Sequence, residues 1–561
     1  MRATLDDLEL LPKRRFGLWF LPDRWSLLAL GLAFAVSLPV LVVFGSLLAA
    51  HGDIWRHLAS TVLLGYVGNT LALAAGVAIG VTLIGVGTAW LVTMCRFPGH
   101  HLFEWALLLP FAVPTYIIGY TYTDLLQYAG PVQTALREAM GWTRQDYWFP
   151  DIRTLGGAIL VMTLVLYPYV YLFARAAFLS QSSCLLDVSR TLGRNPWRHF
   201  LEVAVPMARP AIAGGVALAL METMADFGTV QHFGISTFTT GIYRTWFALG
   251  EPVAAAQLAA VLMLFVFTML WIERSSRSRA RYDHTTAMRP LTCYALSRRR
   301  GMLAAAACFT PILLGFLLPT LALMRMTWRQ GDVLMAGKFL PLAWNSLTLA
   351  ALAAALTAAF AVLVVFGVRL RPTALMKTAS RIAGMGYAIP GTVLAVGVLI
   401  PFARLDNTVN GWLQAHLGIS TGLLLSGTIF GLLFAYVVRF LAVALNGIEA
   451  GFGKINRHLD DAARTLGHPP GGTLLRIHLP LLRGALLTAV VIVFVEVLKE
   501  LPATLIMRPF NFETLAVRVY QFASDERLAE ASTAALAIVA VGLLPVILLS
   551  RAIAHSRPRR G

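Results

Sequence analysis

Charged residues are scarce in this sequence. Only 13% of its 561 residues are Asp, Glu, Lys or Arg, whereas 58% are hydrophobic. This balance excludes a soluble domain of such a size, because a surface that faces water needs more polar and charged side chains. The composition indicates a chain that places most of its side chains in lipid or against other apolar segments.

Cysteines and catalytic motifs are also few. The four cysteines form no C-x-x-C pair and lie in no predicted outer loop, so we expect neither a disulfide nor a cysteine metal site. The sequence contains no HExxH, no GxSxG and no paired catalytic His, so an intramembrane enzyme lacks support.

A phosphate-binding loop is missing as well. No G-x-x-x-x-G-K-[ST] motif occurs, and the nearest stretch, GIEAGFGKIN around Lys454, lacks the first glycine spacing and the final hydroxyl. We therefore expect no ATPase and no cofactor in this chain, and energy for any transport has to come from a separate ATPase or from an ion gradient.

Long apolar runs are abundant. About 20 apolar residues cross a hydrocarbon core of roughly 30 Å as a helix, and lipid offers the backbone no hydrogen-bond partners, which favours helices. The sequence thus predicts an all-α polytopic membrane protein of about twelve transmembrane helices. The twelve runs lie near residues 27–49, 66–93, 103–125, 155–178, 211–233, 252–272, 302–324, 346–368, 382–403, 423–442, 485–507 and 532–552.

The basic residues give a formal net charge of +18, and their placement argues for a membrane rather than nucleic acid. They gather before the first run, between the sixth and seventh runs, and after the last, whereas loops 50–62 and 404–422 hold few. By the positive-inside rule both termini are cytoplasmic. Residues 1–26 carry acids and no apolar core, so we expect an interfacial segment and not a cleaved signal peptide.

The chain also repeats itself. SRTLG at residues 189–193 returns as ARTLG at residues 463–467, an offset of 274. At this offset the sequence aligns Pro206 with Pro480, Glu222 with Glu496, Asp226 with Glu500, Thr240 with Thr514 and Arg244 with Arg518, and at an offset of 276 it aligns Asn69 with Asn345 and Pro114 with Pro390. An even number of spans in each half makes the halves parallel, with a shared path between them.

These features predict five regions. They are an interfacial N-terminal segment at 1–26, a first six-span half at 27–272, a basic cytoplasmic linker at 273–301, a second six-span half at 302–552 and a basic cytoplasmic tail at 553–561.

The longest inner loops carry the sharpest motif. They read DVSRTLGRNPWRHFLEVAVP from Asp187 and DAARTLGHPPGGTLLRIHLP from Asp461. Both resemble the coupling loop of ATP-binding-cassette importer permeases, which reads EAA, three residues, Gly, nine residues, Ile, one residue and Leu-Pro. The matching positions are Asp187, Gly193 and Pro206 in the first copy, and Asp461, Ala462, Ala463, Gly467 and Pro480 in the second. The first copy departs further, with Val-Ser for Ala-Ala and Asp for Glu.

The residues of this loop suit a helix–turn–helix at the inner membrane face. Gly467 can end the short helix in a left-handed conformation, and Pro480 or Pro206 can begin the next helix, where a missing N–H costs little. The resemblance implies the type I importer permease fold, with the loops docking on two copies of a cytoplasmic ATPase that binds the ATP.

Four carboxylates interrupt the apolar runs. Glu222 and Asp226 lie one helical turn apart in the fifth run, near mid-membrane, and Glu496 and Glu500 repeat the arrangement in the eleventh. Charges at such depth usually face a cavity and mark a substrate path, and carboxylate oxygens suit hard cations. The alternative is structural, with the acids paired to Lys499, to Arg244 or to each other.

The segments METMADFGTVQHFGISTFTTGIYRTWF and EVLKELPATLIMRPFNFETLAVRVYQFASDERLAEA resemble the two halves of fused bacterial permeases for ferric iron. The resemblance implies a subunit of the inner membrane, in contact with lipid, that receives ferric iron from a periplasmic solute-binding protein. Permeases for thiamine or a phosphonate share the architecture, and a gradient-coupled secondary transporter is the alternative from another class. Tyrosines such as Tyr116, Tyr167 and Tyr169 are interpreted as packing or interfacial residues, since nothing in the sequence singles out one ring as a ligand.

Overall fold

The structure is a computed structural model that describes residues 24–49, 53–181, 195–278, 294–330 and 339–555. Its elements are almost all helical, as the apolar runs predict. The first half contains α1 (Arg24–Gly45), η2 (Ser46–Leu48), α2 (Asp53–Thr61), α3 (Leu63–Met94), β1 (Cys95–Arg96), α4 (His100–Ala106), η3 (Leu109–Ala112), α5 (Thr115–Leu126), α6 (Pro131–Met140), α7 (Leu155–Leu179), α9 (Pro196–His199), η4 (Phe200–Ala204), α10 (Val205–Ala225), α11 (Gly228–His232), α12 (Phe238–Phe247) and α13 (Pro252–Ser278).

The second half repeats this order, and a short parallel pairing of β2 with β1 joins the two halves. It contains β2 (Tyr294–Ala295), α14 (Arg298–Ile312), η5 (Leu313–Leu317), α15 (Leu318–Gln330), α16 (Phe339–Leu370), α17 (Ala374–Ala383), η7 (Gly386–Ala388), α18 (Gly391–Leu417), α19 (Ile429–Gly453), α20 (His458–Thr465), α21 (Pro470–Thr473), η8 (Leu474–His478), α22 (Leu479–Leu498), α23 (Pro502–Met507), α24 (Leu515–Ser524), η9 (Leu528–Ala531) and α25 (Ser532–His555).

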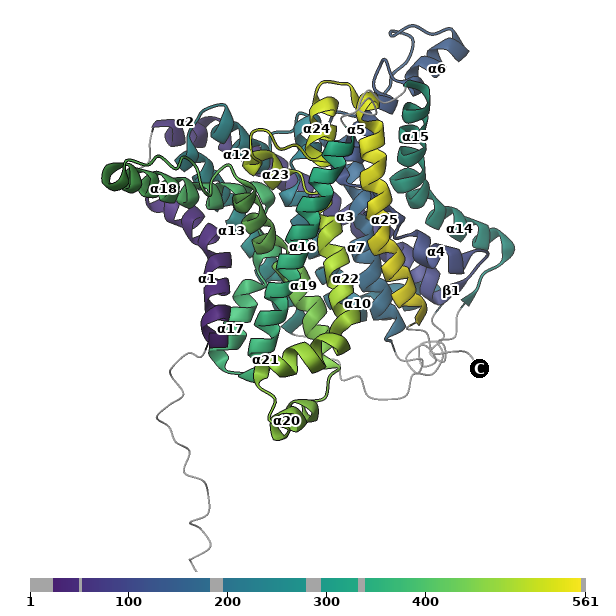
Figure 1. Ribbon diagram of the computed structural model, residues 1–561. Helices are drawn as coiled ribbons and strands as arrows, with labels where there is room; N and C mark the ends of the chain where they lie inside the picture. The colour runs from purple at the N-terminus through teal and green to yellow at the C-terminus, as the bar shows by residue number, and fades with distance from the viewer. Residues whose placement is uncertain (1–23, 50–52, 182–194, 279–293, 331–338, 556–561) are drawn as a thin grey trace, which may run out of the picture.

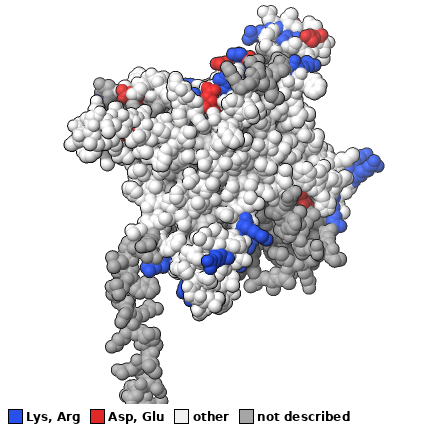
Figure 2. Space-filling model, viewed as in Figure 1, with Lys and Arg blue, Asp and Glu red and all other residues white. Residues whose placement is uncertain are grey.

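The predicted number of spans is confirmed. Among the described residues, 11 helices are long and apolar enough to cross a membrane, and a bent pair, His100–Ala112 with Thr115–Met140, brings the number to 12. The pair bends by 88° at Val113 and Pro114, because a proline disfavours helix at the residue before it. A wide band without charged side chains crosses the middle of the visible face, with charged residues above and below it and a basic cluster at its right edge (Figure 2).

The two halves share tertiary contacts as well as elements. The Asn69 side chain donates to the carbonyl of Ser236, and that of Asn345 donates to the carbonyl of Glu513. The helices that follow are capped by Thr237 and Thr514. The structural partner of Thr514 is therefore Thr237, and the alignments of Thr240 with Thr514 and of Arg244 with Arg518 are wrong. Helix α23 is one residue longer than α11, and the second half holds two more residues between α23 and α24 than the first holds between α11 and α12. An ungapped offset cannot accommodate these three residues.

The first span of each half packs against the other half. Helix α1 lies against α16, α17 and α18, whereas η5 and α15 lie against η3, α5 and α7, on the opposite side of the molecule (Figure 1). Glycines permit the closest approaches: a Cβ on Gly542 of α25 would lie 2.2 Å from the carbonyl oxygen of Ala112, and one on Gly315 would lie 2.6 Å from that of Leu164. Because the first span of each half packs against the other half, the halves are held together and their remaining spans surround a shared centre.

Pro206 and Pro480 lie in the first turn of α10 and α22, as the sequence predicts, but neither begins a separate helix. Each lies inside one continuous span, Pro196–Ala225 or Pro470–Leu498, two residues after a π-helical turn, η4 or η8. A proline inside a helix removes one hydrogen bond and its ring crowds the carbonyl four residues earlier. The wider π turn accommodates both effects, so the helix from the inner loop runs unbroken toward mid-membrane.

Candidate translocation cavity

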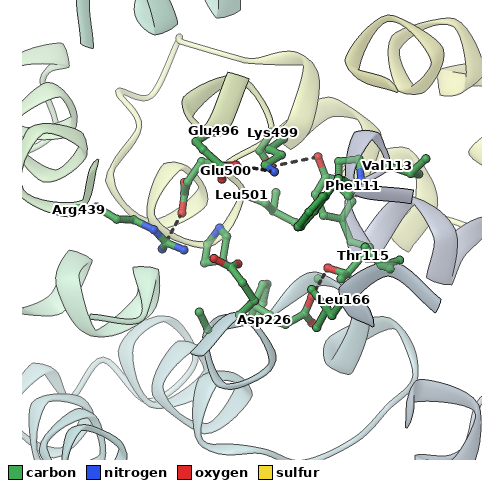
Figure 3. A pocket seen from close by; sticks show the side chains of 18 of the residues that line it. Phe111, Val113, Thr115, Leu166, Asp226, Arg439, Glu496, Lys499, Glu500 and Leu501 are labelled. Carbon is green, nitrogen blue, oxygen red and sulfur yellow. Dashed lines mark hydrogen bonds and ion pairs between the residues drawn. The ribbon is translucent and has the colours of Figure 1, made fainter. Parts of the chain in front are cut away.

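A cavity of about 100 Å³ lies where the two halves meet. Spans α7 and α10 contribute to it from the first half, and α19 and α22 contribute from the second (Figure 3). All four acids identified from the sequence line it, namely Glu222, Asp226, Glu496 and Glu500. The expectation that both pairs approach one shared centre agrees with this geometry.

Asp226 and Glu500 do not continue the helices that carry the first acid of each pair. Helix α10 ends at Ala225 and α22 ends at Leu498, and a short helix, α11 or α23, begins two residues after each acid. The prediction that the two acids of a pair lie one turn apart on a single helix is therefore wrong. The backbone leaves the helix because each second acid binds the free N–H groups of the next short helix.

Asp226 is fully engaged as a cap. One of its oxygens accepts from the backbone N–H groups of Thr229 and Val230, at 3.0 and 3.2 Å. The other accepts from the hydroxyls of Thr115 and Thr229, at 2.6 and 2.9 Å. Its described hydrogen-bond donors are all neutral, so none of them is a counter-charge for this carboxylate.

Glu500 has the same role with a different set of partners. Its oxygens accept from the N–H groups of Ala503 and Thr504, each at 3.0 Å, and from the Thr504 hydroxyl at 2.7 Å. Arg439 of α19, only 7% exposed, lies 3.3 Å from the same carboxylate. The guanidinium fits because residue 391 is glycine: a Cβ there would lie 2.4 Å from Arg439 and 2.8 Å from Glu500.

Glu222 and Glu496 occupy equivalent positions in different surroundings. Both are half-buried. Glu496 forms an ion pair with Lys499 at 2.8 Å, whereas Glu222 accepts a hydrogen bond of 2.6 Å from the hydroxyl of Tyr387, a residue of the second half. Arg244, the other cation considered from the sequence, is exposed on α12 and does not line the cavity.

The duplication has therefore diverged at this centre. Arg439 aligns with Val165, and Lys499 aligns with Ala225, at the offset of 274. Both cations of the lining belong to the second half and lie beside the second pair of acids (Figure 3). Four carboxylates face two cations, which leaves the lining with a formal negative charge, and the surplus lies on the side of the first half.

The second coupling loop projects from one end of the molecule as helix α20 (Figure 1). Asp461, Ala462 and Leu466 are exposed on it, whereas Ala463 is buried. Gly467 follows with φ +76°, and His468 donates to the carbonyl of Ala463, which closes the helix. The predicted glycine cap is thus present; Asp187 and Gly193 of the first loop lie outside the described residues.

A polar joint connects α20 to three spans. Asp460 accepts from Arg369 of α16 at 2.8 Å and lies 2.6 Å from the fully buried His478 of η8. Arg369 also donates to the carbonyls of Phe452, at the end of α19, and of Ile455. Since α19 carries Arg439 and α22 carries Glu496, a displacement of α20 would reach both cavity-lining spans.

Sequence reasoning missed Arg439 and Tyr387. Arg439 does carry a signal, because it is a lone basic residue in the middle of an apolar run and such residues usually mark a pathway. Tyr387 carries none, because a tyrosine near a span's end is ordinary and only the fold brings its hydroxyl to Glu222.

The fold and cavity define a class of protein: a two-half membrane permease with an exposed helix, α20, at one end. Residues 81–282 and 364–560 each match the family described as binding-protein-dependent transport system inner membrane component. The chain belongs to this family, the membrane-spanning permeases of ATP-binding-cassette importers.

Three relatives show which transport systems contain permeases similar to this chain. An Fe(3+)-transport system permease protein of Haemophilus influenzae, FbpB 2, is 26% identical over 86% of this chain and 89% of its own length. The ferric transport system permease protein FbpB of Actinobacillus pleuropneumoniae is 23% identical over 84% of the chain and 69% of its own. The molybdenum transport system permease protein ModB of Escherichia coli is 28% identical over 35% of the chain and 87% of its own length, which is the size of one half.

Proposed function

We propose that this chain imports ferric iron across the bacterial inner membrane. In this proposal a periplasmic solute-binding protein delivers the ion, and two copies of a cytoplasmic ATPase dock on the two coupling loops and drive the cycle. The termini and the basic linker lie in the cytoplasm, as the charge distribution requires.

The acidic cavity between the halves is the observation that carries the proposal. Four carboxylates against two cations make a wall that attracts a multivalent cation and repels an oxyanion, because charges in a low-dielectric passage interact strongly. The relatives aligned along most of the chain are named for ferric transport. A phosphonate fits this wall poorly, whereas thiamine, a cation, remains the alternative that the experiment addresses.

Reconstitution tests the proposal. The permease is assembled with its ATPase in vesicles, and uptake of labelled ferric iron from the loaded binding protein is measured with ATP inside. We expect ATP-dependent iron uptake that excess thiamine or phosphonate does not reduce. ATP-dependent thiamine uptake without iron uptake would assign the chain to the other substrate, and uptake that needs only an ion gradient would exclude the ATPase-driven mechanism.

A further inference from the structure

Two tyrosine hydroxyls and one carboxylate meet at the boundary between the halves. Tyr387 donates to Glu222 at 2.6 Å, and the Tyr387 hydroxyl lies 3.5 Å from that of Tyr169. Tyr169 belongs to α7 and Glu222 to α10, both in the first half, whereas Tyr387 belongs to η7 in the second. Each of the three side chains is only partly buried, and Tyr169 and Glu222 reach the cavity.

This group lies beside the first pair of acids, where no described ion pair joins Glu222 to a cation, although Arg439 is near enough to interact with it electrostatically. Glu222 and Tyr169 both line the cavity, and the lining cations, Arg439 and Lys499, pair with Glu500 and Glu496. Glu222 is the lining carboxylate whose described partner is a phenol and not a cation or a helix end.

The repeat shows that this arrangement is specific to one side. Tyr387 aligns with Phe111 at the offset of 276, and Tyr169 aligns with Val443 at the offset of 274. Neither counterpart has an oxygen. A hydrogen-bonded trio of oxygen atoms is thus present beside Glu222 and has no equivalent beside Glu496, where the chain has Lys499 instead.

We propose that Tyr387, Tyr169 and Glu222 form a transient ferric ion site, in which the two phenol oxygens are ligands and Glu222 accepts the phenolic proton. The inference rests on the proposed function and adds the residues that recognise the cargo. On binding, the O–H bond of Tyr387 breaks and a phenolate O–Fe bond forms, while the proton passes to the Glu222 carboxylate. Tyr169 keeps its proton and donates a lone pair of its neutral oxygen, one water leaves the ion for each O–Fe bond formed, and no electron is transferred. Phenolate and phenol oxygens are hard donors and suit a small trivalent ion.

The position of the site also allows the bound ion to be released. Its ligands come from both halves, so a relative movement of the halves separates Tyr387 from Tyr169 and Glu222. The cycle that moves α20 would therefore also open the site, which is the property a transit site needs.

Absorption spectroscopy tests this site directly. Ferric citrate is added to the purified permease in lipid nanodiscs, and we expect a visible phenolate-to-iron charge-transfer band that redox-inert gallium suppresses by competition. Tyr387→Phe should abolish the band, and Glu222→Gln should move its appearance to higher pH, because the proton acceptor is lost. Tyr122→Phe is the matched control, since the Tyr122 hydroxyl donates to the carbonyl of Leu314 instead, at 2.8 Å; its band should be unchanged.

Uptake by the assembled transporter separates this inference from the proposed function. Loss of a partner that merely orients a metal ligand costs roughly 10- to 100-fold in affinity. Since Tyr387 is itself a proposed ligand, Tyr387→Phe should lower ferric uptake by at least about 10-fold. Wild-type iron uptake with no band, or a band that survives Tyr387→Phe, overturns the site and leaves the proposed function standing. A Tyr387→Phe variant with raised resting ATP hydrolysis and an unchanged band would identify the trio as a latch between the halves, and this also overturns the site. Absence of iron uptake by the wild type would instead refute the proposed function.

Discussion

Glu500→Gln and Glu222→Gln should differ sharply in their effect on stability, although the two acids belong to the same repeated pattern. Each oxygen of Glu500 accepts from a backbone N–H, and one also faces Arg439. Glutamine turns one oxygen into an NH₂ group, which then meets an N–H or a guanidinium that cannot accept. The variant also leaves Arg439 buried without its counter-charge.

The expected magnitude follows from these partners. Breaking a buried ion pair by removing one member costs about 3–5 kcal/mol. Glu222→Gln loses the charge on an acceptor of one described hydrogen bond, from Tyr387, and the amide oxygen can still accept it, so the cost is about 1 kcal/mol. The two variants should therefore differ by roughly 2–4 kcal/mol in the free energy of unfolding.

Asp226→Asn provides an intermediate control. One Asp226 oxygen binds two backbone N–H groups and the other binds only hydroxyls, from Thr115 and Thr229. An asparagine can keep its carbonyl on the N–H groups, and the hydroxyls can rotate to accept from its NH₂. We expect a loss of about 1–2 kcal/mol, closer to the effect of Glu222→Gln.

Equilibrium unfolding in mixed micelles, with a rising fraction of a denaturing detergent, measures these free energies for the purified permease. Ferric uptake per folded molecule is measured in parallel. Glu222→Gln should reduce uptake with little change in stability. If Glu222→Gln proved as destabilising as Glu500→Gln, or if Glu500→Gln unfolded like the wild type, the division into cavity acid and helix cap would be refuted.

Three further predictions concern topology and coupling. A cysteine at Gln330 should react with a membrane-impermeant reagent added outside intact cells, and one at Arg298 should not; the reverse pattern would invert the orientation. Gly467→Pro and Asp461→Arg should each leave a folded permease that no longer captures its ATPase or supports stimulated hydrolysis, and normal hydrolysis in both would contradict docking at α20. Asp460→Asn should lower transport per ATP hydrolysed, because α20 loses its ionic joint, while the ATPase still binds; unchanged coupling would show that the joint is not on the path.

The number of spans and the duplication could be predicted from the sequence, because apolar length and repeated letters are local properties of the chain. The depth of the four acids followed from the same patterns, since Glu222 and Glu496 lie in long apolar runs. Helical periodicity then placed Asp226 and Glu500 on the same helices, and this failed. Helices α10 and α22 end where they do because Asp226 and Glu500 cap α11 and α23, and this capping competes with continuation of the longer helix. The hydrophobicity of the sequence gives no sign of it.

The tertiary structure alone decided how the cavity distributes its charges. Arg439 and Glu500 are 61 positions apart in the chain, and Tyr387 and Glu222 are 165 apart. Their pairing depends on which spans pack together, including the exchange of α1 and α15 between the halves. The sequence by itself determined that acids lie at the centre of a duplicated membrane protein. Only the packing determined that Arg439 joins Glu500 and that Glu222 of the other pair meets the Tyr387 phenol, because such long-range contacts form when both halves close around the same centre.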